Sequence, residues 1–246
     1  MRQAKKSKNN NLGKVDVVIL CGGEGKRLRS LINDRPKVLA PVGDKVFLEL
    51  IIENLKAHGF KRIILSVGYL KEQIIDYFRG REDIKIEFSS EDAPLGTGGA
   101  VKKTGPLIQS EHFFVLNGDS FFPLDFSEFH NHHLKNEALL SIALAKIENV
   151  GDYGSVKMDD SGRISAFNEK ISGKEGGLVN AGIYLMKKGI FSHMPEENCF
   201  SLEYDLFPKI LDKSFYGFMG DGELIDIGTP ERYQKTIRYF LNQIDA

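Results

Sequence analysis

The first 120 residues alternate between short apolar runs and amphipathic stretches. The run "VDVVILC", which begins at Val15, is almost continuously apolar, as is typical of a strand buried on both faces. "FLELIIENLKAHG" places apolar residues at helical spacing and stops at Gly59. "KRIILSVG", "LKEQIIDYFRG", "IKIEFSS" and "HFFVLNGD" continue the alternation. This order predicts an α/β fold in which helices cover both faces of a mostly parallel sheet.

The loops that follow the apolar runs give the first indication of function. In parallel sheets covered by helices, ligands bind outside the carboxyl ends of the strands. Three informative loops lie at such ends, after Cys21, Ser90 and Leu116. The sequence therefore predicts a binding cleft along this edge of the sheet.

Beyond Asp125 the pattern changes to strands joined by short turns. "EALLSIALAKI", "GSVKMDDSGRISAFNEK" and "GGLVNAGIYLMK" are typical of strands, and Asp160-Ser161-Gly162 is a turn signal. We expect a short amphipathic helix in "LEYDLFPKILD", a strand in "ELIDIG" and a last helix in "TPERYQKTIRYFLNQI", with Thr229 as its N-cap. These segments are expected to join the first half in one α/β domain and to cover its cleft.

Charge and composition argue against several classes of protein. The 246 residues carry a formal net charge of −1, so nothing draws the whole chain to nucleic acid or to an acidic membrane. The two cysteines, Cys21 and Cys199, lack metal-ligand spacing and indicate a reducing, cytoplasmic environment. No apolar run approaches the roughly 20 residues that span a bilayer. Residues 1–14 are basic and lack the apolar region of a secretory signal. We therefore predict that they form a disordered, solvated tail.

The stretch "CGGEGKRLRSLINDRPK" combines a glycine loop with a group of cations. Gly22, Gly23 and Gly25 follow the first strand, and Arg27 and Lys37 come shortly afterwards. Glycines let backbone amides approach phosphate oxygens closely, and the cations supply charge for them. The spacing is neither that of the dinucleotide fingerprint nor that of the P-loop. On these residues alone, the stretch is either a phosphate-binding loop or a glycine turn into a basic helix.

The same stretch closely resembles the signature L-x-G-G-x-G-x-R-L-x(n)-P-K-x-L-x-P-V of sugar-1-phosphate nucleotidyltransferases. "APLGTGGA", "LNGD", "YGSV", "FNEK", "VNAGIY" and "DIGTPERY" match further motifs of this family in order, and the resemblance spans about Val15 to Tyr239. It implies a single nucleotidyltransferase domain over residues 15–246, a Rossmann-like three-layer sandwich with a mostly parallel mixed sheet. Residues 15–125 would form the nucleotide-binding half and residues 126–246 the sugar-binding half. Because one helix follows "DIGTPERY", we expect no C-terminal left-handed β-helix.

In that family, an NTP and a sugar 1-phosphate are joined and pyrophosphate is released. The resemblance implies that Arg27 holds the β- and γ-phosphates and that Lys37 bridges the α-phosphate and the sugar phosphate. It also implies that Asp119 and Asp226 are catalytic and hold Mg²⁺, a hard cation that takes one or two carboxylates from the protein when it binds phosphates. Without the resemblance, "NGD" at Asp119 is better explained as a turn than as a metal ligand. The implied nucleotide-binding residues are Leu20, Gly22, Gly23, Gly25, Lys26, Leu95, Gly96, Thr97 and Gly98.

Recognition of the sugar is assigned by the resemblance to the second half of the chain. The family usually has a small hydroxyl residue where Lys26 stands. The lysine either adds charge near the phosphates, which we slightly favour, or faces solvent. The implied sugar-binding residues are Gly154, Glu169, Lys170, Asn180 and Gly182.

The short length, "LGTGGA" and "SLEYDLFPKIL" most resemble guanylyltransferases for mannose 1-phosphate and for D-glycero-D-manno-heptose 1-phosphate. We favour the heptose enzyme, which uses GTP in the synthesis of precursors of surface polysaccharides and glycoproteins. The alternatives are the mannose enzyme, a thymidylyl- or uridylyltransferase for another hexose 1-phosphate, and a non-catalytic nucleotide-sugar sensor. The expected partners are the NTP and the sugar 1-phosphate, without nucleic acid or membrane. The sequence leaves the oligomeric state open, and a homodimer is the commonest assembly.

Three histidines in "HNHHLKNE" offer a second candidate site. On a helix His130 and His133 share a face, whereas His132 points elsewhere. We therefore interpret this stretch as a solvated helix end and not as a metal cluster.

Overall fold

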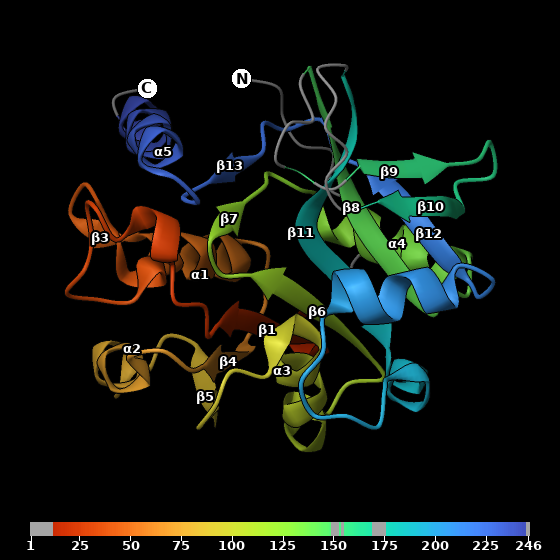
Figure 1. Ribbon diagram of the computed structural model, residues 1–246, viewed down its shortest axis with the longest axis horizontal. Helices are drawn as coiled ribbons and strands as arrows, with labels where there is room; N and C mark the ends of the chain where they lie inside the picture. The colour runs from red at the N-terminus through yellow and green to blue at the C-terminus, as the bar shows by residue number, and fades with distance from the viewer. Residues whose placement is uncertain (1–11, 149–152, 154, 169–175, 245–246) are drawn as a thin grey trace.

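Figure 1 shows the computed structural model of the chain, which describes residues 12–148, 153, 155–168 and 176–244. In this part of the chain, nine strands form one sheet. At its centre and one edge, β6 (His112–Asn117), β1 (Asp16–Cys21), β4 (Arg62–Val67) and β5 (Lys85–Ser90) lie side by side in that order. All four run parallel. The parallel sheet predicted for the first half is therefore confirmed.

The second half extends the same sheet, mostly with antiparallel strands. β11 (Gly177–Lys187) pairs antiparallel with β6, and β8 (Leu140–Ile147) and β9 (Ser155–Met158) pair antiparallel with β11. β10 (Ile164–Asn168) lies beyond β9, and β12 (Phe215–Met219) pairs parallel with β8. The sheet is therefore mixed, and its parallel part carries the glycine loop and the "LNGD" loop.

Two small sheets lie outside the main one. β2 (Pro41–Val42) and β3 (Lys45–Val46) form a hairpin before the first long helix. β7 (Ser120–Phe121) and β13 (Ile225–Asp226) pair antiparallel, although more than 100 residues separate them. This second pairing joins the "LNGD" loop to the "DIGTPERY" segment.

Side chains on the parallel strands alternate between the two faces of the sheet. Val17 and Ile19 belong to one buried cluster, with side chains of α1 (Phe47–Ala57), α2 (Lys71–Phe78), α4 (Phe126–Lys135) and α5 (Pro230–Ile244). Val18 belongs to a second cluster, with α3 (Gly96–Thr104) and the segment 190–210. Because each face needs its own cover to exclude water, the result is the predicted three-layer sandwich.

Short helical turns connect these elements. Leu12, in the first of them, is buried in the core, so the packed part of the chain begins at least three residues before the predicted Val15. None of the described helices is both long and apolar enough to cross a membrane. The 3-10 turns are Leu12–Lys14, Lys26–Leu28, Lys37–Leu39, Gly105–Leu107, Lys188–His193 and Phe207–Ile210, and Leu202–Leu206 is a π-helical turn.

Two expectations for local structure are wrong. "LEYDLFPKILD" is not one amphipathic helix but the π turn Leu202–Leu206 followed by the 3-10 turn Phe207–Ile210. Pro208 explains the break, because proline has no N–H to donate and its ring clashes with the preceding helical turn. The end of α4 is not solvated throughout, because His133 is fully buried and donates or accepts hydrogen bonds with His112 and Ser141.

Candidate active site

A cavity of about 350 Å³ lies at the carboxyl ends of β1, β5 and β6. Its walls come from the glycine loop after β1, from Glu91 and residues 94–97 after β5, and from Asn117 and Asp119 after β6. This is the edge of the sheet at which the sequence predicts a cleft. The predicted site residues that line the cavity are Leu20, Gly22, Gly23, Gly25, Lys37, Leu95, Gly96, Thr97 and Asp119.

The glycine loop leaves room for the lysine that follows it. Gly25 has φ +60°, and a methyl group on it would lie 2.9 Å from Cβ of Lys37. Glycine therefore permits both the left-handed backbone and the close passage of Lys37. Nζ of Lys37 lies 2.6 Å from Oδ2 of Asp119, and the lysine side chain is only 12% exposed, whereas that of Asp119 is 45% exposed. Lys37 is thus held within the cavity by a carboxylate that remains accessible.

The two predicted metal ligands are brought together by the backbone. In the β7–β13 pair, Asp226 lies opposite Ser120, the residue after Asp119. The amide of Ile227 also donates to the carbonyl oxygen of Asp119 at 3.1 Å. Asp119, the residue directly before β7, and Asp226 in β13 therefore lie close together in the folded backbone, as a shared ligand site would require.

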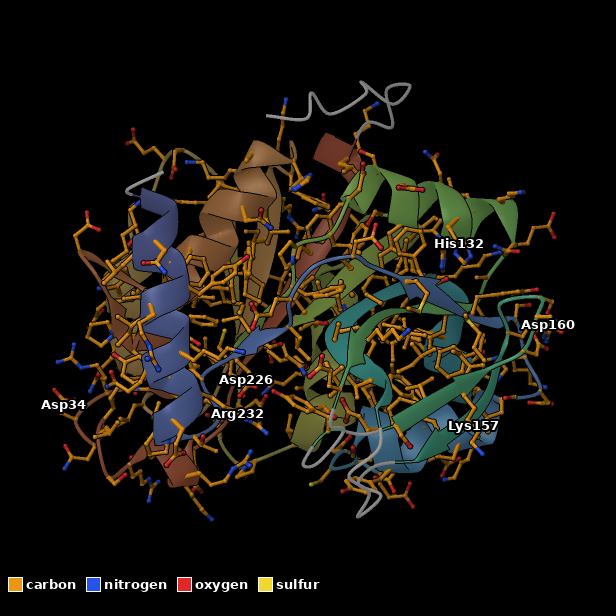
Figure 2. The ribbon with its side chains drawn as sticks, turned by 90° about the horizontal axis from the view of Figure 1, so that it is seen from above. Asp34, His132, Lys157, Asp160, Asp226 and Arg232 are labelled. Carbon is orange, nitrogen blue, oxygen red and sulfur yellow. The ribbon has the colours of Figure 1, made fainter. Side chains whose placement is uncertain are left out.

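The carboxylate of Asp226 is more enclosed than that of Asp119. Its Oδ1 accepts a hydrogen bond from the amide of Gly228 at 2.7 Å, and its Oδ2 accepts one from the hydroxyl of Tyr153. Arg232 lies 3.4 Å from the same Oδ2 and stacks over the Tyr153 ring at 4.4 Å from its centre. Figure 2 shows Asp226 and Arg232 close together near the start of α5. The surroundings of Asp226 are thus cationic.

The structure places Arg27 near this second group of charges and outside the cavity walls. A methyl group on Gly228 would lie 3.6 Å from Nη2 of Arg27 and 3.8 Å from Nη1 of Arg232. Lys26 does not line the cavity either. Its side chain is 76% exposed and forms an ion pair with Glu24 at 3.2 Å. Of the two interpretations of Lys26, this position favours the one in which it faces solvent.

Glu91 is a buried carboxylate in the cavity wall that the sequence analysis missed. Its Oε1 accepts a hydrogen bond from the Ser66 hydroxyl and its Oε2 one from the amide of Leu95, both at 3.3 Å. Burial raises the pKa of Glu91 above its ordinary value, in spite of these hydrogen bonds. The available signal was its position directly after β5, at the carboxyl end of a parallel strand.

Cys21 also lines the cavity but is not a suitable nucleophile. Burial, with the nearby charge of Asp119, raises the pKa of its thiol strongly. The thiol is therefore protonated at neutral pH, and only a thiolate is an effective nucleophile.

Two of the predicted sugar-binding residues lie beside the cavity. β11 has an irregular register between Asn180 and Tyr184, and Oδ1 of Asn180 accepts from the amide of Gly182 at 2.8 Å within it. Gly182 has φ +74°, and a methyl group on it would lie 2.8 Å from Nδ2 of Asn117, a cavity residue. The other three predicted residues, Gly154, Glu169 and Lys170, lie outside the described part of the chain.

Gly98, predicted to bind the nucleotide, contacts the protein itself. It does not line the cavity, and its amide donates to the carbonyl oxygen of Phe200 at 2.9 Å. The side chains that the sequence analysis did not single out include Asn117, Tyr153, Tyr184 and Glu203. All four stand inside motifs that it quoted, "LNGD", "YGSV", "VNAGIY" and "SLEYDLFPKIL", so motif membership was the only available signal.

The donor groups at Asp119 and Asp226 fit a hard divalent cation. Carboxylate oxygens are the ligands that Mg²⁺ prefers, and the accessible Asp119 uses only Oδ2 in its ion pair with Lys37. Among the described residues, no cluster of three or more His, Cys, Asp or Glu side chains could hold a metal. A cation at this position would therefore take most of its ligands from substrate phosphates and water.

Comparison with known proteins identifies the family. The nucleotidyl transferase family matches residues 16–243. The D-glycero-alpha-D-manno-heptose 1-phosphate guanylyltransferase of Campylobacter jejuni is 42% identical over 89% of this chain and 97% of its own, and that of Aneurinibacillus thermoaerophilus is 41% identical over 90% and 96%. The crystal structure of HddC from Yersinia pseudotuberculosis complexed with GMP-PN is 36% identical, with a TM-score of 0.83 over 92% of this chain and 99% of that one. The chain belongs to the nucleotidyl transferase family.

Proposed function

We propose that this protein transfers GMP from GTP to D-glycero-α-D-manno-heptose 1-phosphate and releases pyrophosphate. The observation that carries the proposal is the identity of 42% and 41% to two guanylyltransferases for this heptose, over nearly their whole length. The complex of HddC with GMP-PN also supports a guanine nucleotide as the donor.

The buried carboxylate of Glu91 supports guanine on chemical grounds. The Watson–Crick edge of guanine offers two neighbouring donors, N1–H and N2–H, and an ionised carboxylate is an acceptor only. Uracil and thymine offer a single N–H between two carbonyl oxygens. These carbonyl oxygens and a carboxylate repel each other, because both carry negative charge. Glu91 stands next to Leu95 of the loop predicted to bind the base. A carboxylate in this wall therefore favours guanine over uracil or thymine.

The chemistry that we propose is an in-line displacement at the α-phosphorus. An oxygen of the sugar phosphate forms the new P–O bond while the bond to the β-phosphate oxygen breaks, and its electron pair leaves with pyrophosphate. The nucleophile is already anionic, so positioning and neutralisation of charge carry the catalysis. The amides of Gly22 and Gly23 would hold the nucleotide phosphates. Lys37 would neutralise the reacting phosphates and Arg27 the leaving pyrophosphate.

Asp119 and Asp226 are the residues that would hold a divalent cation, which we propose is Mg²⁺. When bound, such an ion neutralises phosphate charge and orients the phosphate oxygens. Asp119 is the more accessible of the two carboxylates, and Asp226 is already surrounded by Tyr153, Gly228 and Arg232. We therefore propose that Asp119 is the principal ligand.

We propose that residues 126–246 bind the sugar phosphate and that residues 15–125 bind the nucleotide. Asn180 and Gly182 support this division, because their strand β11 passes beside the cavity residue Asn117. Gly154, Glu169 and Lys170 complete the proposed sugar-binding set. Their chemistry suits it, since a carboxylate accepts hydrogen bonds from sugar hydroxyls and a lysine pairs with phosphate.

Pyrophosphate release from a matrix of nucleotides and sugar phosphates tests the proposal. GTP, ATP, UTP and dTTP are each combined with heptose, mannose and glucose 1-phosphates in the presence of Mg²⁺. We expect GTP with the heptose to give the highest kcat/KM. A preference for mannose 1-phosphate would contradict the proposed sugar, and a preference for UTP or dTTP the proposed base. Tight binding of a nucleotide sugar without turnover of any pair would instead indicate a sensor.

A further inference from the structure

The carboxylate of Glu203 lies outside the proposed reaction centre. It connects the proposed nucleotide-binding half of the chain to the proposed sugar-binding half. Oε2 of Glu203 accepts hydrogen bonds from the hydroxyls of Thr97 at 2.6 Å and Ser201 at 2.8 Å. Its Oε1 accepts one from the hydroxyl of Tyr184 at 3.0 Å. Thr97 belongs to the nucleotide loop and Tyr184 to the strand that carries Asn180, so one side chain contacts both halves.

The direction of these hydrogen bonds is fixed by the ionised carboxylate. A carboxylate only accepts, so the Thr97 and Tyr184 hydroxyls must both point their hydrogens at Glu203. Each hydroxyl then offers its oxygen as an acceptor elsewhere. The oxygen of Tyr184 accepts from Nδ2 of Asn180 at 2.7 Å, and that of Thr97 accepts from the amide of Leu202 at 2.9 Å.

This polarity determines how Asn180 presents its amide. Nδ2 points to Tyr184 and Oδ1 points to the amide of Gly182, so both ends of the side chain are held. Tyr184 is fully buried, which shields its hydrogen bonds with Glu203 and Asn180 from competition with water. The remaining donor and acceptor capacity of Asn180 is therefore presented in one orientation only.

The nucleotide loop is fixed by the same segment of the chain. Phe200 donates its amide to the carbonyl oxygen of Leu95 at 3.0 Å and accepts from the amides of Gly98 and Gly99 at 2.9 and 3.2 Å. Lys102 donates to the carbonyl oxygens of Pro195 and Glu196 at 2.7 and 2.8 Å. The segment 195–203 is therefore hydrogen-bonded to Leu95 and to α3.

We propose that Glu203 is a positioning residue that couples the nucleotide loop to the orientation of Asn180 through Tyr184. Ordering of the loop by the nucleotide fixes Thr97 and Glu203, and the Tyr184 hydroxyl transmits this to Asn180. Nucleotide binding thereby prepares the site for the sugar phosphate. The assignment of Thr97 to the nucleotide side and Asn180 to the sugar side rests on the proposed function.

Tyr184→Phe breaks the connection with the smallest change in packing. The variant keeps the ring but loses the hydrogen bonds of the hydroxyl with Glu203 and Asn180. We expect the KM for the sugar phosphate to rise about three- to tenfold, because Asn180 loses its fixed orientation. The KM for GTP should change less than about twofold, because the contacts of Glu203 with Thr97 and Ser201 remain. Tyr216→Phe is the matched control, since Tyr216 lies on β12, outside the cavity.

Glu203→Gln tests the polarity and not merely the presence of a hydrogen-bonding group. Glutamine has an NH₂ group in place of one carboxylate oxygen, so it cannot accept hydrogen bonds from Thr97 and Tyr184 on opposite sides at once. We expect it to raise the KM of at least one substrate about tenfold or more, because hydrogen bonds to a charged group are stronger than neutral ones. Thr97→Val should raise the KM for GTP more than Thr97→Ser does, since only serine retains the hydroxyl that donates to Glu203.

Hydrogen exchange measures the coupling without any sugar. In the wild type, we expect a nonhydrolysable GTP analogue with Mg²⁺ to protect the amides of residues 95–99 and also those of residues 178–184. In Tyr184→Phe, the amides of residues 95–99 should still be protected, whereas those of residues 178–184 should no longer be. Unchanged exchange of residues 178–184 in the wild type, or an unchanged sugar KM in Tyr184→Phe, would overturn the coupling.

The two proposals fail in different ways. If wild-type enzyme transfers GMP to the heptose phosphate and Tyr184→Phe has the same KM values, the coupling is wrong and the proposed function stands. If the wild type uses another nucleotide and sugar, the proposed substrates are wrong, and the same comparison of variants is made with that pair. A fall in Tm together with equal rises in both KM values would show a merely structural role for Tyr184.

Discussion

Charged side chains gather at both ends of the parallel strands, but they differ in how far the protein itself satisfies their hydrogen bonds. At the amino ends, Asp16 accepts hydrogen bonds from Arg62 at 2.5 Å and from the amides of Gln109 and Ser110 at 2.5 and 2.9 Å. Arg62 in turn donates to both carboxylate oxygens of Glu87. Burial alone would raise the pKa of Asp16, but these hydrogen bonds and the Arg62 charge hold it below its ordinary value. This cluster is satisfied by the protein itself.

At the carboxyl ends, charged groups are left with unused capacity. The side chain of Asp119 is 45% exposed, against 6% for Asp16, although each forms an ion pair with a largely buried cation. Glu91 is buried with a raised pKa, which is the less favourable environment for a carboxylate. The comparison teaches that one end of these strands is arranged for stability and the other for a ligand. Substitutions at the two ends should therefore have different consequences.

The largest expected effect is on catalysis at the carboxyl end. Lys37→Ala and Asp119→Asn should each lower kcat for pyrophosphate release about 10²- to 10³-fold, the loss typical of removing one group that stabilises a transition state. Tm should stay close to that of the wild type, because the Asp119 carboxylate in the ion pair that both substitutions remove is partly exposed. Steady-state kinetics and thermal unfolding of the same preparations provide the measurement. A large fall in Tm with little loss of kcat would remove the contrast between the two ends.

The amino end should show the opposite pattern. Arg62→Ala leaves Asp16 buried without its guanidinium partner and should lower the free energy of unfolding by about 3 kcal/mol. At a temperature where the variant is folded, its KM values should match those of the wild type. Denaturant unfolding supplies the free energy, with Arg79→Ala as the control. The pair of Arg79 and Asp76 is exposed, so its loss should be too small to resolve.

Selection of the base offers a sharper test within the carboxyl end. Glu91→Gln should lower kcat/KM for GTP about ten- to a hundredfold, since it replaces one of the two acceptor oxygens that face the guanine donors with an NH₂ donor. Activity with UTP should fall less, so the ratio of the two rates is the measurement. Equal losses with both nucleotides would show that Glu91 supports the loop and does not select the base.

Acidification of the GTP reaction should have a related effect. Because the pKa of Glu91 is raised, its carboxyl takes up a proton at a higher pH than an ordinary glutamate would. The protonated form loses its charge and part of its acceptor capacity, so the KM for GTP should rise as pH falls. In Glu91→Gln this dependence should be absent. A wild-type KM that is independent of pH would contradict the proposed contact.

The smallest effect concerns the buried histidines at the amino end of β6, whereas the cavity lies at its carboxyl end. Burial, reinforced by neighbouring histidines, lowers the pKa of His133 to about 3. Its pKa in the unfolded chain is about 6.5, so the unfolded state binds the proton first and stability falls as pH decreases below 6.5. The slope should approach about 1.4 kcal/mol per pH unit for this one proton. Denaturant unfolding between pH 7 and 5 measures it, and His133→Asn should show a smaller slope.

Much of the fold follows from local patterns in the first half of the sequence. Continuous apolar runs ending in glycine or Asn-Gly predicted the parallel strands, and they placed the loops containing Gly22 and Asp119 at one edge. The burial of His133 could also have been predicted from the sequence, because Phe126, Phe129 and His133 share one face at helical spacing. The interpretation of this stretch as a solvated helix end considered the spacing of the histidines among themselves, whereas their spacing from Phe126 and Phe129 places His133 in the core.

The contacts between distant segments could not be predicted in the same way. Glu203 and Thr97 are 106 positions apart, and nothing in "LEYDL" indicates that its carboxylate meets a threonine of the nucleotide loop. The pairing of β7 with β13, which brings Asp226 beside Asp119, involves strands of only two residues. Such short strands carry no periodic signal, and their pairing is specified by the packing of the larger sheet.

Pyrophosphate release in one assay tests the central claim most directly. Wild type, Asp119→Asn and Asp16→Asn are compared with GTP, D-glycero-α-D-manno-heptose 1-phosphate and Mg²⁺ at a temperature where all three are folded. We predict turnover by the wild type and by Asp16→Asn, and a loss of about 10²- to 10³-fold in Asp119→Asn alone. Turnover by Asp119→Asn at the wild-type rate, or no release by the wild type from GTP and this heptose phosphate, would contradict the account.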